Sequence, residues 1–331
     1  MSRKPIIQIV NTGGTIASRY RADAGGWISE ASADELVATV PGLAEIAELR
    51  LTEHSQVNGY RIDTSTVFSL AMRIRNLVQQ EETDGVVVTH GTATLEETAY
   101  LLDLTVNTPK PIVLTGAQRR FDDLGADGPM NLYCAVKVAA DCAARDHGVL
   151  GVFDSRIFSA RDLIKIHTHA LSAFGARDCG PIGYVSRDQV ILFARPERRL
   201  YFDVNHIRSN VQLIKLVQGG NDLLIRACIA GGVDGIVIEG ISSGHANDDC
   251  FVAICDALES GLPIVTVPRI LFGGNNIKGT QYAHPGSVHS MVERGVIAGG
   301  YLSGQKARIL LMVALAKTAD RGQLQELFLR A

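Results

Sequence analysis

Short apolar runs alternate with segments whose apolar residues recur at three- and four-residue spacing along most of this chain. Continuous apolar runs are typical of strands buried on both faces, and the longer spacing is typical of helices with one buried face. The predicted strands are Ile6–Val10, Leu49–Glu53, Asp84–Thr89, Pro111–Thr115, Val149–Asp154, Val211–Val217, Gly235–Glu239 and Pro263–Val267. The predicted helices are a short one opened by Ser32-x-x-Glu35, then Asp63–Gln79, Thr94–Leu104, Ala126–Arg145, Asp222–Ala230, Asn247–Leu258 and Ser303–Lys317.

Strands and helices that alternate in this way predict a parallel sheet covered by helices on both faces. The pattern fades after Arg187, where charges and Pro196 interrupt it, and then restarts. We therefore predict an α/β protein with a larger, doubly wound, mainly parallel N-terminal domain over residues 1–191. A linker over 192–209 and a smaller C-terminal α/β domain over 210–331 follow, which suits a chain of 331 residues.

Composition narrows the classes of partner. Hydrophobic residues make up 46% of the chain, which is enough for a buried core. The net charge is −3, and the sequence has no long run of either sign of charge. Nucleic acid or an anionic membrane is therefore not expected as the main partner. The apolar run Ile6–Val10 is too short for a signal peptide or a membrane span, so we expect a cytoplasmic protein. The six cysteines form no CxxC pair, which favours free thiols in a reducing compartment over a zinc site.

The first predicted strand runs into the sequence Thr12-Gly13-Gly14-Thr15. Adjacent glycines allow backbone conformations closed to other residues and a close approach to a ligand. Thr15 would then present a hydroxyl at the carboxyl end of a strand, where open α/β sheets bind ligands. An ordinary turn with a capping threonine is the alternative. The segment has neither GxGxxG nor GK[ST], so a nucleotide loop is disfavoured.

Hydroxyl and amide side chains also follow two further strands. The three strand-end groups are Thr12 with Thr15, Ser55 with Gln56, and Thr92 with Thr94. Carboxyl ends of parallel strands share one edge of the sheet, so these groups are expected to lie together. Helix capping is the alternative, and we expect it of Thr94, because Thr94-x-x-Glu97 has the form of a capping box.

A lysine adds a possible base to this edge. Lys165 ends the segment Arg161–Lys165, shortly after the fifth predicted strand, where a solvated surface charge is the simpler interpretation. A lysine beside a hydroxyl and away from water has a lowered pKa and can accept a proton. Thr92 and Lys165 together would then activate a hydroxyl nucleophile. Backbone amides near Gly14 or Gly91 would face the oxyanion.

Five segments resemble the bacterial L-asparaginase/glutaminase family, in order and over nearly the whole chain. They are NTGGTIAS at 11–18, THGTATLEETAYLLDLTV at 89–106, ADGPMNLY at 126–133, RDLIK at 161–165 and SGQKARILL at 303–311. The resemblance implies a threonine-nucleophile amidohydrolase of two α/β domains that uses no metal or organic cofactor. It also implies a homotetramer, built as a dimer of dimers. Each active site would lie between the larger domain of one subunit and the smaller domain of its partner.

The resemblance also assigns roles by position. Thr15 matches the nucleophile, Thr92 the second catalytic threonine and Lys165 the lysine paired with it. Ser55 and Gln56 match the pair that holds the substrate's α-carboxylate, and the segment from Thr12 to Gly14 matches the loop that shapes the acyl pocket. The lid over the site carries a tyrosine in the family, and the candidates here are Tyr20 and Trp27, in a segment (19–29) expected to be a mobile excursion over the strand end.

Two positions depart from the family pattern. Ala93 replaces an aspartate that binds the substrate's α-ammonium, and His245 stands at or near a position where the second domain often has asparagine. The chain is therefore expected to hydrolyse either asparagine or an asparagine-like amide or lactam without a free α-ammonium. A non-catalytic sensor of small carboxylates is the alternative from another class. Thr15, Thr92 and Lys165 together argue against it, because binding alone requires no activated hydroxyl.

Overall fold

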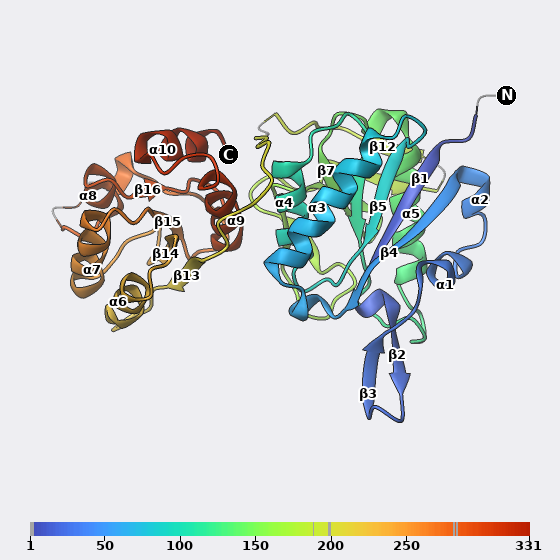
Figure 1. Ribbon diagram of the computed structural model, residues 1–331, viewed down its shortest axis with the longest axis horizontal. Coiled ribbons are helices and arrows are strands. Elements are labelled where there is room, and N and C mark those ends of the chain that lie inside the picture. Colours follow the sequence, from blue (N-terminus) through green and yellow to red (C-terminus); the bar gives the residue numbers. More distant parts are fainter. Residues whose placement is uncertain (1–2, 188, 198–199, 281, 283) are drawn as a thin grey trace. The chain divides into compact units, whose positions relative to one another are not determined.

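The computed structural model describes residues 3–187, 189–197, 200–280, 282 and 284–331. It divides into two compact units, Met1–Glu197 and Arg198–Ala331, which are described separately below (Figure 1). Of the predicted linker, residues 198 and 199 lie outside the described residues, and Leu192 still belongs to a strand of the first unit. The boundaries at 191 and 210 stay predictions.

The first unit is built on an eight-stranded sheet in the order β12-β11-β8-β7-β6-β5-β1-β4. Its parallel part consists of β1 (Ile6–Gly13), β4 (Glu48–Val57), β5 (Gly85–Thr89), β6 (Ile112–Thr115) and β7 (Val149–Phe153). Its antiparallel edge consists of β8 (Arg156–Ser159), β11 (Gly183–Ser186) and β12 (Gln189–Leu192). The predicted doubly wound, mainly parallel fold is confirmed.

Helices cover both faces of this sheet (Figure 1). They are α1 (Ala33–Ala38), α2 (Leu43–Ile46), α3 (Thr64–Gln79), α4 (Leu95–Thr105) and α5 (Gly128–Ala140), with 3₁₀ turns η1 (Thr15–Ala17), η2 (Gly59–Arg61) and η3 (Cys142–Ala144). Helices α3 and α4 pack together on one face, and α1, α2 and α5 on the other. The next strand of this sheet along the chain, β4, pairs with one side of β1, and the strand after it, β5, pairs with the other side. The direction of winding therefore reverses between β1 and β5, the place where such sheets bind ligands.

Two antiparallel hairpins leave the main sheet. The hairpin of β2 (Ser18–Arg21) and β3 (Gly26–Ser29) occupies most of the segment expected to be a mobile excursion over the strand end. A second hairpin pairs β9 (Leu163–Lys165) with β10 (Phe174–Ala176). The first hairpin follows the turn that carries Thr15, and the second places Lys165.

The structure confirms some of the features predicted at helix ends and corrects others. The capping box of Ser32 and Glu35 is confirmed at α1. Thr94 is the N-cap residue of α4, as predicted, but its side chain makes no capping hydrogen bond, because its hydroxyl donates to the Gly59 carbonyl at 2.8 Å. The helix predicted over 126–145 ends at Ala140, because the Asp141 carboxylate accepts a hydrogen bond from the Ala143 amide and starts η3.

The second unit contains a smaller parallel sheet with the strand order β13-β14-β15-β16. The predicted smaller C-terminal α/β domain is confirmed. The strands are β13 (Val211–Lys215), β14 (Gly235–Gly240), β15 (Ile264–Pro268) and β16 (Ile297–Ala298). The helices are α6 (Leu223–Ala230), α7 (Asp248–Glu259), α8 (Val288–Glu293), α9 (Gly304–Ala314) and α10 (Arg321–Arg330), with the 3₁₀ turn η4 (Lys278–Thr280). Across the described parts of both units, no helix has the length and apolarity needed to cross a membrane.

Candidate active site

The turn that carries Thr15 is compressed against the end of the neighbouring strand. Gly13 and Gly14 have φ angles of 93° and 88°, in the left-handed region that favours glycine. A Cβ on Gly14 would lie 2.3 Å from the Gly91 Cα, so no side chain fits there. Thr15 opens η1 in a half-buried position, so its side chain is partly open to solvent. The turn therefore presents a hydroxyl that is available to a ligand.

The side chain of Asn11 holds this turn in place through hydrogen bonds. Its side-chain oxygen accepts from the Gly13 amide at 3.1 Å and from the Thr89 hydroxyl at 2.8 Å. Its side-chain nitrogen donates to the Ala31 carbonyl at 3.1 Å and to the Glu53 carboxylate at 2.8 Å. Asn11 is fully buried and uses its whole hydrogen-bonding capacity, so it ties β1 to β4, to β5 and to the chain that leaves the first hairpin.

Thr92 and Lys165, predicted as a pair, are in direct contact. Lys165 Nζ lies 2.8 Å from Thr92 Oγ1, and the Thr92 side chain is buried. Burial lowers the pKa of Lys165, and the nearby Glu96 carboxylate, which also accepts from the Lys165 backbone amide at 2.6 Å, partly opposes that shift. This is the environment in which a lysine can act as a base.

Gln118 completes this cluster, and sequence reasoning missed it. Its Oε1 lies 3.1 Å from Lys165 Nζ and 3.3 Å from Thr92 Oγ1. The Gln118 Nε2 is buried and has no hydrogen-bond partner within the described structure. Gln118 follows β6 just as Thr92 follows β5, so the strand-end argument applied to the fourth predicted strand identifies it.

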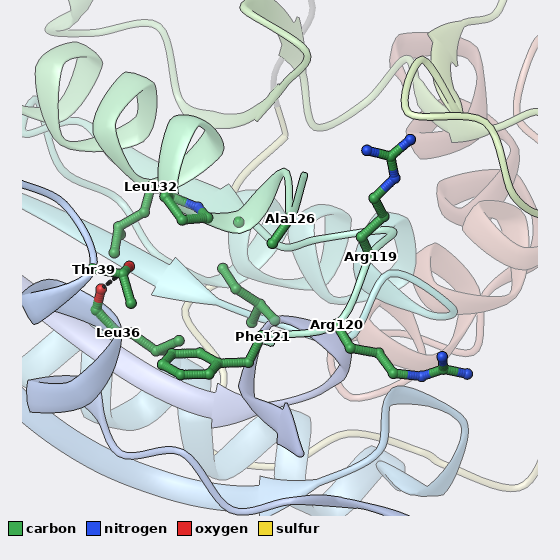
Figure 2. Close-up of a pocket in the computed structure, with 10 residues that line it drawn as sticks. Leu36, Thr39, Arg119, Arg120, Phe121, Ala126 and Leu132 are labelled. Atoms are coloured by element: carbon green, nitrogen blue, oxygen red, sulfur yellow. Dashed lines mark hydrogen bonds between the residues drawn. The ribbon is translucent and has the colours of Figure 1, made fainter. Parts of the chain in front are cut away.

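The loop after Gln118 packs against the first hairpin, and its residues help to line a small apolar pocket. Figure 2 shows Phe121 turned into this pocket toward Leu36, whereas Arg119 and Arg120 point away from it. The Arg19 guanidinium lies 4.4 Å from the centre of the Phe121 ring, and the Arg120 guanidinium lies 4.0 Å from that of Trp27. The same loop therefore holds the hairpin and carries Gln118.

Both lid candidates lie on that hairpin. Tyr20 and Trp27 are directly opposite each other across β2 and β3, with ring centres 5.4 Å apart. Their side chains are 55% and 37% exposed, and the Arg120 guanidinium covers one face of the Trp27 ring. Tyr20 is thus the freer of the two aromatic rings.

The predicted carboxylate-binding residues lie inside β4, which extends to Val57 rather than ending at Glu53. The Ser55 hydroxyl donates to the Thr12 carbonyl at 3.1 Å, so it faces the end of β1. Gln56 is exposed, and its Nε2 lies 3.5 Å from the Glu30 carbonyl, a weak contact that a ligand can replace. Ala93 is exposed next to Thr92 and offers a methyl group where a charged contact is expected from the family pattern.

His245 belongs to the second unit and serves a local role there. Its Nδ1 accepts from the Val288 amide at 3.2 Å, at the start of α8, and its Nε2 lies 3.2 Å from the Ser243 hydroxyl. Burial lowers the pKa of His245, so the neutral ring is favoured. In that form Nε2 carries the hydrogen and donates to Ser243, so His245 is not a base for this serine. Its place in the active site stays a prediction.

Comparison with known families decides the identity of this arrangement. The model described as Asparaginase, N-terminal, matches residues 6–198, and the Glutaminase/Asparaginase C-terminal domain matches residues 210–328. The chain belongs to the asparaginase/glutaminase family. It is 34% identical to L-asparaginase 2 of Escherichia coli (strain K12), covering 98% of this chain and 92% of that protein. It is 33% identical to a glutaminase-asparaginase of Pseudomonas fluorescens biotype A, covering 97% and 89%.

A solved structure supports the same assignment. The crystal structure of a protein titled probable cytoplasmic L-asparaginase from Campylobacter jejuni matches with a TM-score of 0.88 and 32% identity. The match covers 99% of this chain and 100% of that one. The resemblance found in the sequence is confirmed, and the chain is an asparaginase-type amidohydrolase.

The candidate site of this asparaginase-family enzyme brings together hydroxyls, side-chain amides and Lys165, with the Glu96 carboxylate beside the lysine. No group of three or more His, Cys, Asp or Glu side chains is placed to hold a metal ion in the described part of the chain. Acyl transfer to a hydroxyl is the chemistry that such a set of groups can perform.

Proposed function

We propose that this enzyme hydrolyses the side-chain amide of a small carboxylate substrate to an acid and ammonia, through an acyl-enzyme on Thr15. The observation that carries the proposal is the 2.8 Å contact between Thr92 Oγ1 and a Lys165 ammonium whose pKa is lowered by burial. The turn that carries Thr15 touches the loop of Thr92, through the close approach of Gly14 to Gly91.

The reaction proceeds in two halves. Thr15 Oγ attacks the amide carbonyl, its proton passes to Thr92 Oγ, and the Thr92 proton moves to Lys165 Nζ. The C–N bond then breaks, the leaving nitrogen takes a proton from the same pair, and ammonia departs, which leaves an ester on Thr15. Water attacks this ester by the same proton path and releases the acid. Backbone amides near Gly14 or Gly91 stabilise the oxyanion in both halves.

Substrate recognition rests on a carboxylate held by Ser55 and Gln56. L-asparagine is the first candidate, from the family and the names of its relatives. Ala93 favours a second candidate, an asparagine-like amide or lactam without a free α-ammonium, because an exposed methyl group gives no counter-charge. Loss of a desolvated charge contact costs about 2–5 kcal/mol, so this single position can change the preferred substrate.

Assembly and location complete the proposal. A site at the edge of an open sheet needs a cover to exclude water, and the short hairpin supplies little of it. We propose a homo-oligomer, a dimer of dimers, in which the smaller domain of a partner subunit covers each site. Sedimentation of a fully active monomer at assay concentration would contradict this.

A cytoplasmic location is proposed because all six cysteines are free thiols. Recovery of the protein in an oxidising compartment on cell fractionation would contradict this location.

The test is product formation over a substrate panel. The panel comprises L-asparagine, L-glutamine, N-acetyl-L-asparagine and succinamate, with ammonia as the readout, and a lactam whose ring opening is followed by mass spectrometry. Turnover of any member supports the amidohydrolase. Binding of small carboxylates by calorimetry, without turnover of any amide or lactam, would support the sensor instead.

A further inference from the structure

The side-chain oxygen of Gln118 touches both members of the Thr92–Lys165 pair. The three atoms form a triangle with edges of 2.8, 3.1 and 3.3 Å. The orientation of the amide is fixed by chemistry, because its nitrogen would set two donors against each other if it faced the Lys165 ammonium. Gln118 therefore acts as an acceptor at the point where the proposed proton transfer takes place.

The loop that carries Gln118 is held rigidly. The Asp127 carboxylate accepts from the backbone amides of Gln118, at 3.0 and 3.1 Å, and of Arg119, at 2.8 Å. The Asn131 side chain donates to that carboxylate and to the Gly116 carbonyl. Asp127 stands at the start of α5 yet does not cap it, so its carboxylate serves the loop instead.

The charge of residue 118 matters because few charges face Lys165. On the packed helix α4, Glu96 is the carboxylate that affects it. The paired strand β10 carries only Phe174, Gly175 and Ala176, with Phe174 opposite Lys165. Arg161 and Asp162, in the turn before β9, pair with each other at 2.6 Å. A neutral acceptor at 118 orients Lys165 without holding it permanently as an ammonium.

We propose that Gln118 is a positioning residue, whose neutral amide oxygen holds Lys165 Nζ and Thr92 Oγ1 in line for proton transfer between them. The proposal rests on the proposed function. When Lys165 is an amine, Gln118 accepts one of its N–H bonds and so directs the nitrogen lone pair at the Thr92 hydroxyl. The Thr92 O–H bond then breaks as an N–H bond forms, and the Thr92 oxygen takes the proton of the attacking Thr15 hydroxyl.

Two nearly isosteric substitutions at this position separate charge from geometry. Gln118→Glu keeps the acceptor and adds a negative charge, which favours the Lys165 ammonium. The acidic limb of the kcat–pH profile should move up by about 1–3 pH units, with kcat recovering above it. Gln118→Met removes the acceptor, so kcat should fall about 10- to 100-fold at every pH while KM changes less than about threefold. Arg119→Gln, on the same loop but bonded to the Gly125 carbonyl, is the control and should match the wild type.

A second measurement does not depend on turnover. Competitive acetylation of Lys165 as a function of pH, read by peptide mass spectrometry, reports the pKa of its amine in the resting protein. Gln118→Glu should raise this pKa by about 1–3 units, and Gln118→Met should lower it. If no amide or lactam is hydrolysed, the proposed function fails, but acetylation still reports whether Gln118 controls Lys165.

Two results would overturn the role given to Gln118. One is an unchanged acidic limb and an unchanged acetylation profile in Gln118→Glu. The other is a Gln118→Met enzyme that changes KM alone, which would mean that the unpartnered Nε2 binds substrate. Circular dichroism and urea midpoints of each variant, compared with those of Arg119→Gln, establish whether the variants fold.

Discussion

His90 makes the first unit sensitive to acid. It is fully buried, its Nδ1 donates to the Gly91 carbonyl at 2.8 Å, and its Nε2 accepts from the Thr98 hydroxyl at 3.0 Å. This neutral arrangement supports the loop of Thr92. Burial lowers the pKa of His90 from 6.5 to about 4.

The sign and size of the effect follow from proton linkage. The unfolded chain binds the proton at higher pH than the folded one, so stability falls as pH drops from about 6.5 to about 4. The full loss is about 3 kcal/mol, since each pKa unit corresponds to about 1.4 kcal/mol. Between pH 7.5 and 4.5 the expected loss from His90 alone is about 2 to 3 kcal/mol.

Urea unfolding of wild type and His90→Asn at both pH values isolates this contribution. Asparagine keeps an N–H for the Gly91 carbonyl but does not titrate in this range. The stability advantage of the wild type over the variant should shrink by about 2 to 3 kcal/mol at the lower pH, at fixed protein concentration. His206→Asn, at an exposed histidine, is the control and should change by less than about 0.5 kcal/mol. An advantage that stays constant between the two pH values would refute the reasoning.

Three further predictions concern the site. Thr15→Ala and Thr92→Val should each lower kcat for ammonia release at least about tenfold while the circular dichroism spectrum is unchanged, because each removes a hydroxyl of the proton path. Gly14→Ala should destabilise the protein by about 3 kcal/mol or more in urea unfolding, since its Cβ would lie 2.3 Å from the Gly91 Cα. Ala93→Asp should raise kcat/KM for L-asparagine relative to succinamate by about 30-fold or more, and an unchanged ratio would remove Ala93 from substrate selection.

The parallel strands could be predicted because both of their faces are buried, which leaves a continuous apolar run such as the one in β5. The strands β11 and β12 were missed because they are short and carry exposed residues such as Tyr184 and Gln189. The first hairpin gave no periodic signal either, since most of its side chains face solvent.

Strand-end hydroxyls led to Thr15 and Thr92, because the ends of parallel strands share one edge. The contact of Thr92 with Lys165 could not be derived from spacing, since Lys165 lies on β9, outside the main sheet. The sequence around Asn11 shows only that it follows the apolar run Ile6–Val10. Its four hydrogen bonds reach residues up to 78 positions away, and such pairing is invisible in local sequence.

The central claim is that an ester forms on Thr15. Acid quenching of the enzyme during turnover of its best substrate, followed by proteolysis and mass spectrometry, should find the acyl group on the peptide that contains Thr15. The account predicts this adduct in the wild type and its absence in Thr15→Ala. Turnover without any adduct, or an adduct on the peptide that contains Thr92, would contradict it.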